Sequence, residues 1–214
     1  MVSIMNIPNL YNLFNRCLTA EYVTVSNGAD ICFQRDSDAL YIFFEKSDGL
    51  GDWINNLSFC VQPYGEMERP WHCHGGFLRV FKSTKDSINE ALNDKNISSV
   101  TLVGYSHGAA LALLAHEYIW FNYPHLREDL HGYGFGCPRV LHGRIPKCVL
   151  MRWSNFLRID HRCDLITHLP PALFGFHHAG HRLVIGRPML SGIDAHRPES
   201  YQKALDRNGR GKKT

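Results

Sequence analysis

Apolar residues along this chain fall into short runs separated by polar segments. Residues 40–44 and 100–103 are apolar at nearly every position, which is typical of strands buried on both faces of a sheet. Residues 109–123 are rich in Ala and Leu and end before Pro124, so they predict a buried helix. Further strands are expected at residues 132–136, 155–159 and 182–185. Strands that alternate with helices predict an α/β fold with a mostly parallel central sheet and helices on both faces.

The N-terminal part of the chain carries a different pattern. Residues 8–20 predict a helix whose apolar face is formed by Leu10, Leu13, Phe14 and Cys17. Residues 22–26 and 31–34 are strand-like and flank an Asn-Gly pair, which is a strong hairpin signal. We therefore expect an antiparallel N-terminal edge on the sheet. Residues 76–92 carry apolar side chains near helical spacing and predict one further long helix.

Composition limits the classes of protein to consider. The chain has 214 residues, of which 44% are hydrophobic and 20% charged, so it is globular rather than disordered. Its formal net charge is +3, but four of the 23 basic residues lie among the last eight positions, and the remaining 19 face 20 acidic residues. We therefore predict a single domain over residues 1–206, a basic disordered tail over residues 207–214, and no nucleic-acid-binding surface.

Cysteine usage and hydropathy suggest a compartment. Seven cysteines are scattered without a CxxC pair, which favours free thiols over a disulfide framework. Residues 1–16 lack the basic start and continuous apolar run of a secretory signal. The longest apolar stretch, residues 109–121, is shorter than the roughly 20 residues that a bilayer requires. We therefore predict a cytoplasmic protein without a transmembrane segment, and leave open an export route that needs no N-terminal signal.

Residues 104–108 read Gly-Tyr-Ser-His-Gly, the GxSxG pattern of a nucleophile elbow. A serine on a sharp turn between a strand and a helix is exposed to substrate, and the flanking glycines let the two backbones approach closely. The helix that follows directs backbone N–H groups at a developing oxyanion. An apolar strand precedes this pattern and a helix follows it, so Ser106 is the predicted nucleophile. A bland serine in a glycine-rich turn is the alternative.

Residues 104–112 resemble the nucleophile segment of the class 3 (fungal-type) lipases, a family of the α/β-hydrolase superfamily. Four other segments agree with that family in the same order: residues 47–59, His74-Gly75-Gly76-Phe77, Phe135-Gly136-Cys137-Pro138-Arg139-Val140 and residues 164–171. The resemblance covers residues 38–200. It implies the α/β-hydrolase fold and the hydrolysis of carboxylic esters.

A serine nucleophile needs a base and a group that orients the base. The resemblance implies Asp164 as the orienting acid, and Asp160 is the local alternative because it lies nearer the end of its strand. The chain order of α/β-hydrolases places the base after the aspartate, and the resemblance implies His196. The other histidines in that part of the chain are His168, His177, His178 and His181.

The oxyanion hole needs two donors near the nucleophile. One is the backbone N–H of His107, the residue after the serine. The resemblance implies Ser47 as the second donor, although Glu45-Lys46 stands where the family usually has Arg-Gly. An alternative interprets residues 74–76 as the His-Gly-Gly oxyanion loop of other lipases. The apolar side of a short lid is implied for Trp53, Ile54 and Leu57, with an ordinary loop anchored by a core tryptophan as the alternative.

These residues together predict a serine esterase or lipase that acts on acylglycerols, phospholipids or small esters through an acyl-enzyme. No cofactor is expected, and no metal, because the histidines at 72–74 and 177–181 form neither an HExxH nor a paired CxxC pattern. The substrate is the only partner expected, with peripheral contact to a lipid surface. A non-catalytic, lipase-like binding module is the alternative, motivated by Glu45-Lys46 and a short stretch between Asp164 and His196.

Overall fold

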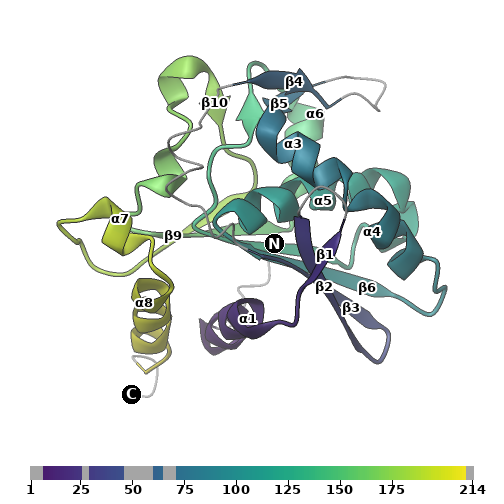
Figure 1. Ribbon diagram of the computed structural model, residues 1–214, viewed down its shortest axis with the longest axis horizontal. Helices are drawn as coiled ribbons and strands as arrows, with labels where there is room; N and C mark the ends of the chain where they lie inside the picture. Colours follow the sequence, from purple (N-terminus) through teal and green to yellow (C-terminus); the bar gives the residue numbers. More distant parts are fainter. Residues whose placement is uncertain (1–6, 26–28, 46–59, 65–70, 211–214) are drawn as a thin grey trace.

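A seven-stranded sheet forms the centre of the computed structural model, which describes residues 7–25, 29–45, 60–64 and 71–210 (Figure 1). In spatial order its strands are β1 (Val23–Val25), β2 (Ala29–Asp36), β3 (Ala39–Phe44), β6 (Ser99–Tyr105), β7 (Leu130–Phe135), β9 (Phe156–His161) and β11 (His181–Ile185). The strands from β3 to β11 are parallel, whereas β1 and β2 pair in antiparallel fashion. The predicted parallel sheet with an antiparallel N-terminal edge is confirmed.

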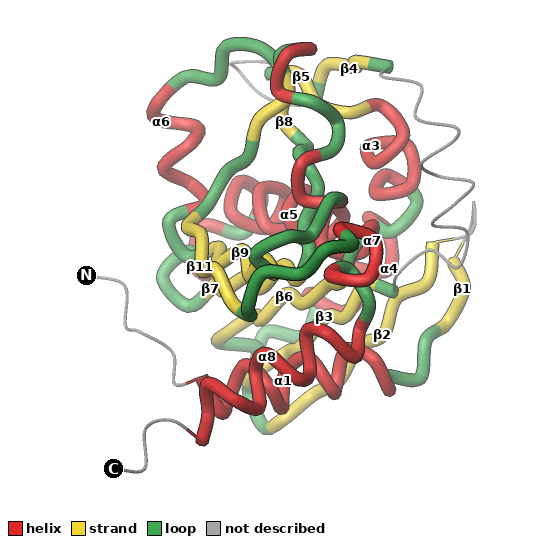
Figure 2. The backbone as a smooth tube through the Cα atoms, turned by 90° about the vertical axis from the view of Figure 1, so that its left-hand side faces the viewer, coloured by secondary structure: helices red, strands yellow, loops and turns green. Residues whose placement is uncertain are grey.

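Helices cover both faces of this sheet (Figure 2). One layer contains α3 (Gly75–Lys82), α4 (Lys85–Leu92) and α5 (His107–Asn122), and the other contains α1 (Ile7–Thr19) and α8 (Pro198–Arg210). Successive strand residues point to opposite faces, so Leu102 of β6 packs into the first layer and Val103 into the second. Burial on both faces explains why β3 and β6 are apolar at nearly every position.

The central helix α5 is surrounded by protein. Every residue from Gly108 to Ile119 is buried, which is why its sequence is apolar on all sides. The helix ends at Asn122, and the 3₁₀ turn η2 (Pro124–Leu126) follows. The remaining short elements are α6 (Lys147–Leu150), η3 (Met151–Trp153), η4 (Ile166–His168), η5 (Ala172–Phe174) and α7 (Gly192–Ala195).

The predicted helix over residues 76–92 is wrong in one respect, because it is divided into α3 and α4 at Ser83 and Thr84. The Ser83 hydroxyl donates to the carbonyl of Val80, and the Thr84 hydroxyl donates to the carbonyl of Phe81, each at 2.7 Å. The backbone N–H groups of the same two residues reach the same two carbonyls in tight i to i+3 bonds. The carbonyls are thus satisfied locally, and the helix stops.

A second, antiparallel sheet of four short strands was not anticipated from the sequence. Its spatial order is β10 (Phe176–His177), β8 (Leu141–His142), β5 (His72–His74) and β4 (Val61–Pro63). It lies on the same side of the molecule as α3 (Figure 1). Strands of two or three residues leave no period in a sequence, which explains why the pattern of apolar residues does not reveal them.

The C-terminal helix α8 runs to Arg210, past residue 206 where the sequence predicted the domain to end. Residues 211–214 lie outside the described residues, so the disordered tail and the single-domain organisation stay predictions. None of the helices in the described ranges has both the length and the apolar composition needed to cross a bilayer. All seven cysteines carry free thiols.

Candidate active site

Ser106 lies where β6 ends and α5 begins, at the carboxyl edge of the parallel strands. Its backbone has φ 57° and ψ −121°, a strained conformation for a residue with a side chain. A Cβ atom at Gly104 would lie 2.1 Å from the carbonyl oxygen of Gly108, and one at Gly108 would lie 2.2 Å from the carbonyl oxygen of Phe44. Only glycine fits at either position, so the GxSxG pattern is explained by this close approach of strand and helix.

Three predicted site residues from distant parts of the chain meet at this turn. The Oγ atom of Ser106 lies 2.8 Å from Nε2 of His196, and Nδ1 of His196 lies 2.7 Å from Oδ2 of Asp164. All three side chains are buried. Ser106 follows β6, Asp164 follows β9, and His196 lies between α7 and α8, so the sheet and its two helical layers bring them together.

The Asp164 carboxylate is held by further donors. The backbone N–H of Ile166 donates to Oδ1 at 2.8 Å, and the Tyr201 hydroxyl donates to Oδ2 at 2.5 Å. Burial, followed by the charge of Asp164, raises the pKa of Tyr201, so the hydroxyl keeps its proton and remains a donor. Tyr201 also accepts a hydrogen bond of 3.0 Å from the backbone N–H of His161. These bonds fix the carboxylate toward His196.

His196 is held by its surroundings as well as by Asp164. The hydroxyl of Tyr105 donates to the carbonyl of His196, and the two rings stack with centroids 5.1 Å apart. Gly136 has a φ of +59°, and a Cβ there would lie 2.8 Å from Cε1 of His196 and 3.0 Å from Oδ2 of Asp164. Gly136 thus has to lack a side chain to leave room for the imidazole and the carboxylate.

The alternative residues that the sequence left open have other partners. Asp160 forms ion pairs with Arg158 at 3.2 Å and Arg182 at 2.7 Å, and burial raises its pKa while Arg158 opposes that effect. A ring nitrogen of His177 lies 2.6 Å from the carbonyl of Gly143, and one of His178 lies 2.9 Å from the carbonyl of Thr167. His168 and His181 are exposed. Among the described histidines, only His196 bonds to Ser106.

The two histidines predicted near the oxyanion hole lie at the N-terminal ends of helices, His74 before α3 and His107 in α5. His107 is the first residue of α5, where a backbone N–H has no acceptor within the helix. His74 instead accepts a hydrogen bond at Nδ1 from the N–H of Phe77, 3.4 Å away, and so caps α3. Burial lowers the pKa of His74 to about 4, so the ring is neutral and Nδ1 can accept. This capping role weighs against the His-Gly-Gly oxyanion loop.

Four predicted site residues lie outside the described residues: Ser47, Trp53, Ile54 and Leu57. Their roles as second oxyanion donor and lid stay predictions. In the ranges that the structure describes, no group of three or more His, Cys, Asp or Glu side chains is arranged to hold a metal ion.

Known proteins resemble this chain in sequence. The family model for the class 3 lipases matches residues 41–174. A lipase of Rhizomucor miehei is 31% identical over 146 residues, which cover 66% of this chain and 40% of that lipase. A secreted mono- and diacylglycerol lipase of Fusarium solani is 25% identical over 158 residues, which cover 71% of this chain and 45% of the relative. The chain therefore spans less than half the length of these relatives.

Solved structures resemble it in fold. The structure of the Rhizomucor miehei triacylglyceride lipase aligns with a TM-score of 0.70 and 26% identity, covering 77% of this chain and 65% of that one. A propeptide complex of the Rhizomucor miehei lipase aligns with a TM-score of 0.73 and 23% identity, over 83% of this chain and 68% of that one. The α/β-hydrolase fold is thereby confirmed. The relatives do not support the predicted cytoplasmic location, since one of them is named as secreted.

Proposed function

Because this chain belongs to the class 3 lipase family, we propose that it hydrolyses carboxylic esters with Ser106 as nucleophile, His196 as base and Asp164 as the orienting acid. The observation that carries this proposal is the line of hydrogen bonds from the serine through the imidazole to the buried carboxylate, 2.8 and 2.7 Å long. A serine hydroxyl hydrogen-bonded to an imidazole is activated for attack, since the imidazole can take its proton.

In the proposed reaction Oγ of Ser106 attacks the ester carbonyl carbon while Nε2 of His196 accepts the serine proton. The carbonyl electrons move to oxygen, and the N–H of His107 together with Ser47 stabilises the resulting oxyanion. The C–O bond to the alcohol then breaks, and His196 returns the proton to the leaving oxygen. In the second half His196 takes a proton from water, whose oxygen attacks the acyl carbon. The bond from that carbon to Oγ then breaks, His196 returns the proton to Oγ, and the carboxylic acid leaves Ser106 free.

Asp164 accepts a hydrogen bond from the Nδ1–H of His196, and this bond selects the tautomer with a free lone pair at Nε2. When Nε2 becomes protonated, the carboxylate stabilises the imidazolium. Tyr201 and the N–H of Ile166 keep the carboxylate in place through both steps. Pre-positioned donors of this kind favour the charged transition state without reorganising during the reaction.

The proposed substrates are acylglycerols, phospholipids or small acyl esters. Names of relatives support the first class, because they are a triacylglyceride lipase and a mono- and diacylglycerol lipase. We propose that Trp53, Ile54 and Leu57 contact a lipid surface and that the basic residues at the C-terminus add attraction to anionic lipid.

The test is the hydrolysis of p-nitrophenyl esters from acetate to palmitate by the wild type, Ser106→Ala and Ser154→Ala. Ser154 is an exposed serine next to β9 and serves as the matched control. We expect turnover that is lost in Ser106→Ala and kept in Ser154→Ala. The chain-length optimum then separates an esterase from a lipase. A folded wild type that is inactive on every ester and on phospholipid would contradict the proposal.

A further inference from the structure

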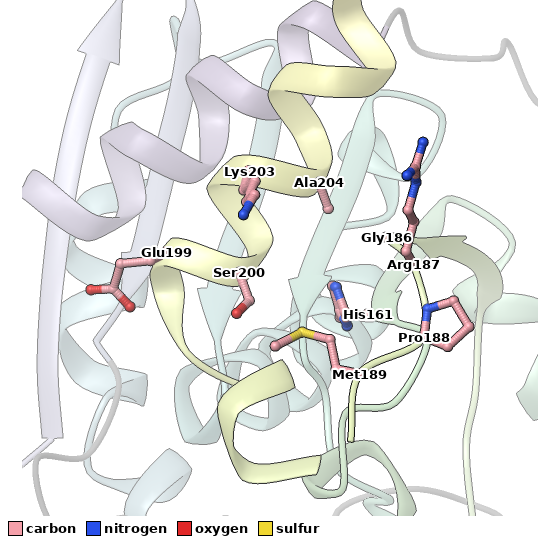
Figure 3. Close-up of a pocket in the computed structure, with 9 residues that line it drawn as sticks. All are labelled: His161, Gly186, Arg187, Pro188, Met189, Glu199, Ser200, Lys203 and Ala204. Carbon is pink, nitrogen blue, oxygen red and sulfur yellow. The ribbon is translucent and has the colours of Figure 1, made fainter. Parts of the chain in front are cut away.

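A cavity of about 590 Å³ lies between α8 and the loop after β11 (Figure 3). None of Ser106, Asp164 and His196 lines it. The volume falls within the range of about 300–1,000 Å³ that is usual for small-molecule sites. The cavity is therefore a candidate second site, distinct from the position of the nucleophile.

The loop that forms one wall is fixed in place. Gly186 has a φ of +76°, and a Cβ at this position would lie 2.1 Å from Nε2 of His161, so the loop passes directly over the imidazole. Three residues after Gly186, the N–H of Met189 donates to Sγ of Cys163 at 3.3 Å. One end of the wall thus packs on His161, the last residue of β9, and the other end is hydrogen-bonded to Cys163, which follows that strand.

Two cations line this cavity, Arg187 from the loop and Lys203 from α8. Neither side chain has a hydrogen bond or an ion pair with any residue that the structure describes. One acid, Glu199, also lines the cavity, but Figure 3 shows its carboxylate on the side of α8 opposite Arg187. The lining therefore holds two cations and one acid, a formal excess of one positive charge.

The rest of the lining is apolar or neutral. Met189, Pro188 and Ala204 offer hydrocarbon surface, and His161 lies between the helix and the loop (Figure 3). Its imidazole is buried, and Nδ1 has no hydrogen-bond partner within the described residues. Unpaired cations beside hydrocarbon suit a ligand with an anionic head and an apolar chain, since the two parts find matching surfaces.

We propose that this cavity binds an anionic amphiphile, whose oxyanion head group lies between Arg187 and Lys203 and whose apolar chain packs on Met189. The head group is a carboxylate or a phosphate, the two oxyanions that guanidinium and ammonium groups bind well. The proposal goes beyond ester hydrolysis and does not require it, because the lining contains no part of the proposed triad.

The test follows the methyl group of Met189 by NMR in full-length Ser106→Ala protein carrying ¹³C-methyl methionine. The chain has five methionines, and the Met189 resonance is assigned by its loss in Met189→Leu. Decanoate, decyl phosphate and decanol are added below their micelle-forming concentrations. We expect a saturable shift of the Met189 resonance with at least one of the two anions and none with decanol. Met151 lies just before β9, whereas His161 at the far end of that strand lines the cavity. The chemical shift of Met151 is therefore expected not to change.

Charge variants provide the matched controls. Combining Lys203→Gln with Arg187→Gln is expected to weaken anion binding roughly tenfold or more. Glu199→Gln, which removes one charge of the opposite sign from the same helix as Lys203, is expected to leave it equal or tighter. The anion that shifts Met189 at lower concentration identifies the head group. An equal response to decanol, no response to either anion, or equal weakening by Glu199→Gln would each overturn the proposal. Because the serine is already absent, none of these outcomes depends on catalysis.

Discussion

Two carboxylates are completely buried near opposite ends of α5, and their surroundings differ. Asp164 lies beside the N-terminal end of the helix and accepts hydrogen bonds from Ile166 N–H, the Tyr201 hydroxyl and Nδ1 of His196. Glu117 lies toward the C-terminal end of α5 and has one hydrogen-bond partner among the described residues, Arg152, whose Nη1 is 2.6 Å from Oε1. The second oxygen of Glu117 has no hydrogen-bond partner in the described part of the chain.

The two sites differ in how many donors surround the buried carboxylate. Burial raises the pKa of Glu117 to about 7, and the single bond from Arg152 opposes this effect only in part. Arg152 also stacks on Trp120, with its guanidinium carbon 4.8 Å from the ring centroid. Its guanidinium therefore contacts an aromatic ring as well as the Glu117 carboxylate. Around Asp164, by contrast, two neutral donors and an imidazole are aimed at one carboxylate. Such directed donors are the arrangement that a charge used in catalysis needs.

The largest effect is expected from Asp164→Asn. An amide at this position favours the wrong tautomer of His196, so kcat should fall by about 10⁴-fold. Glu117→Gln, the same chemical change at the other end of α5, should leave kcat unchanged. Turnover of a p-nitrophenyl ester by the two folded variants checks this. A loss of less than about tenfold in Asp164→Asn would remove the aspartate from the proposed mechanism.

Gly108→Ala should give the next largest effect, on stability. The new Cβ would lie 2.2 Å from the carbonyl oxygen of Phe44, a backbone atom that cannot turn away. We expect the free energy of unfolding to drop by about 4 kcal/mol. Urea unfolding at pH 7 measures it. A drop of less than about 1 kcal/mol would show that β3 and α5 are not in such close contact.

The pH dependence of stability should reveal Glu117. Its carboxyl loses its proton near pH 4.5 in the unfolded chain and near pH 7 in the folded protein, so the folded state binds more protons between these values. Stability contributed by this group is therefore complete below pH 4.5 and is lost as the pH rises through 7, by about 3 kcal/mol in all. Urea unfolding from pH 4.5 to 8 should show this loss of stability in the wild type but not in Glu117→Gln, so the difference in free energy of unfolding between the two should change with pH. A constant difference would contradict the raised pKa.

Tyr201→Phe should have the smallest of these effects. It removes one hydrogen bond to Asp164 and leaves two, so kcat should fall by about tenfold, or about 1.4 kcal/mol. Tyr118→Phe is the control, because Tyr118 lies next to Glu117 and donates to Oδ1 of Asn89, away from the serine. Parallel kcat measurements distinguish the two. Equal losses in both variants would indicate a general effect of losing a tyrosine hydroxyl.

The parts of the fold that the sequence reveals are those with local signals. The buried strands β3 and β6 and the helix α5 each carry an apolar run, and the elbow combines two glycines with a strand and a helix around Ser106. The small antiparallel sheet has no such signal, because its strands β8 and β10 are two residues long and pair with segments far away in the chain. The division between α3 and α4 depends on the hydroxyl groups of Ser83 and Thr84, which a helical period does not register.

Within the candidate site, chain order and family resemblance led to Asp164, but spacing alone could not separate it from Asp160. That choice depends on Arg182 of β11, which is adjacent to β9 only in the folded sheet and pairs with Asp160. The sequence also could not predict the ion pair of the buried Glu117, because its partner Arg152 lies 35 positions away. Both ion pairs join segments that are distant in the sequence, and they form only when the chain is folded.

In the proposed mechanism Ser106 is a nucleophile activated by His196 and Asp164. To test this, the folded protein is treated with a fluorophosphonate and the adduct is located by peptide mass spectrometry. We expect one adduct, on the peptide that contains Ser106, and a rate of labelling that falls sharply in Asp164→Asn. A folded protein that takes up no label, or that is labelled on another serine and keeps the label in Ser106→Ala, would contradict it.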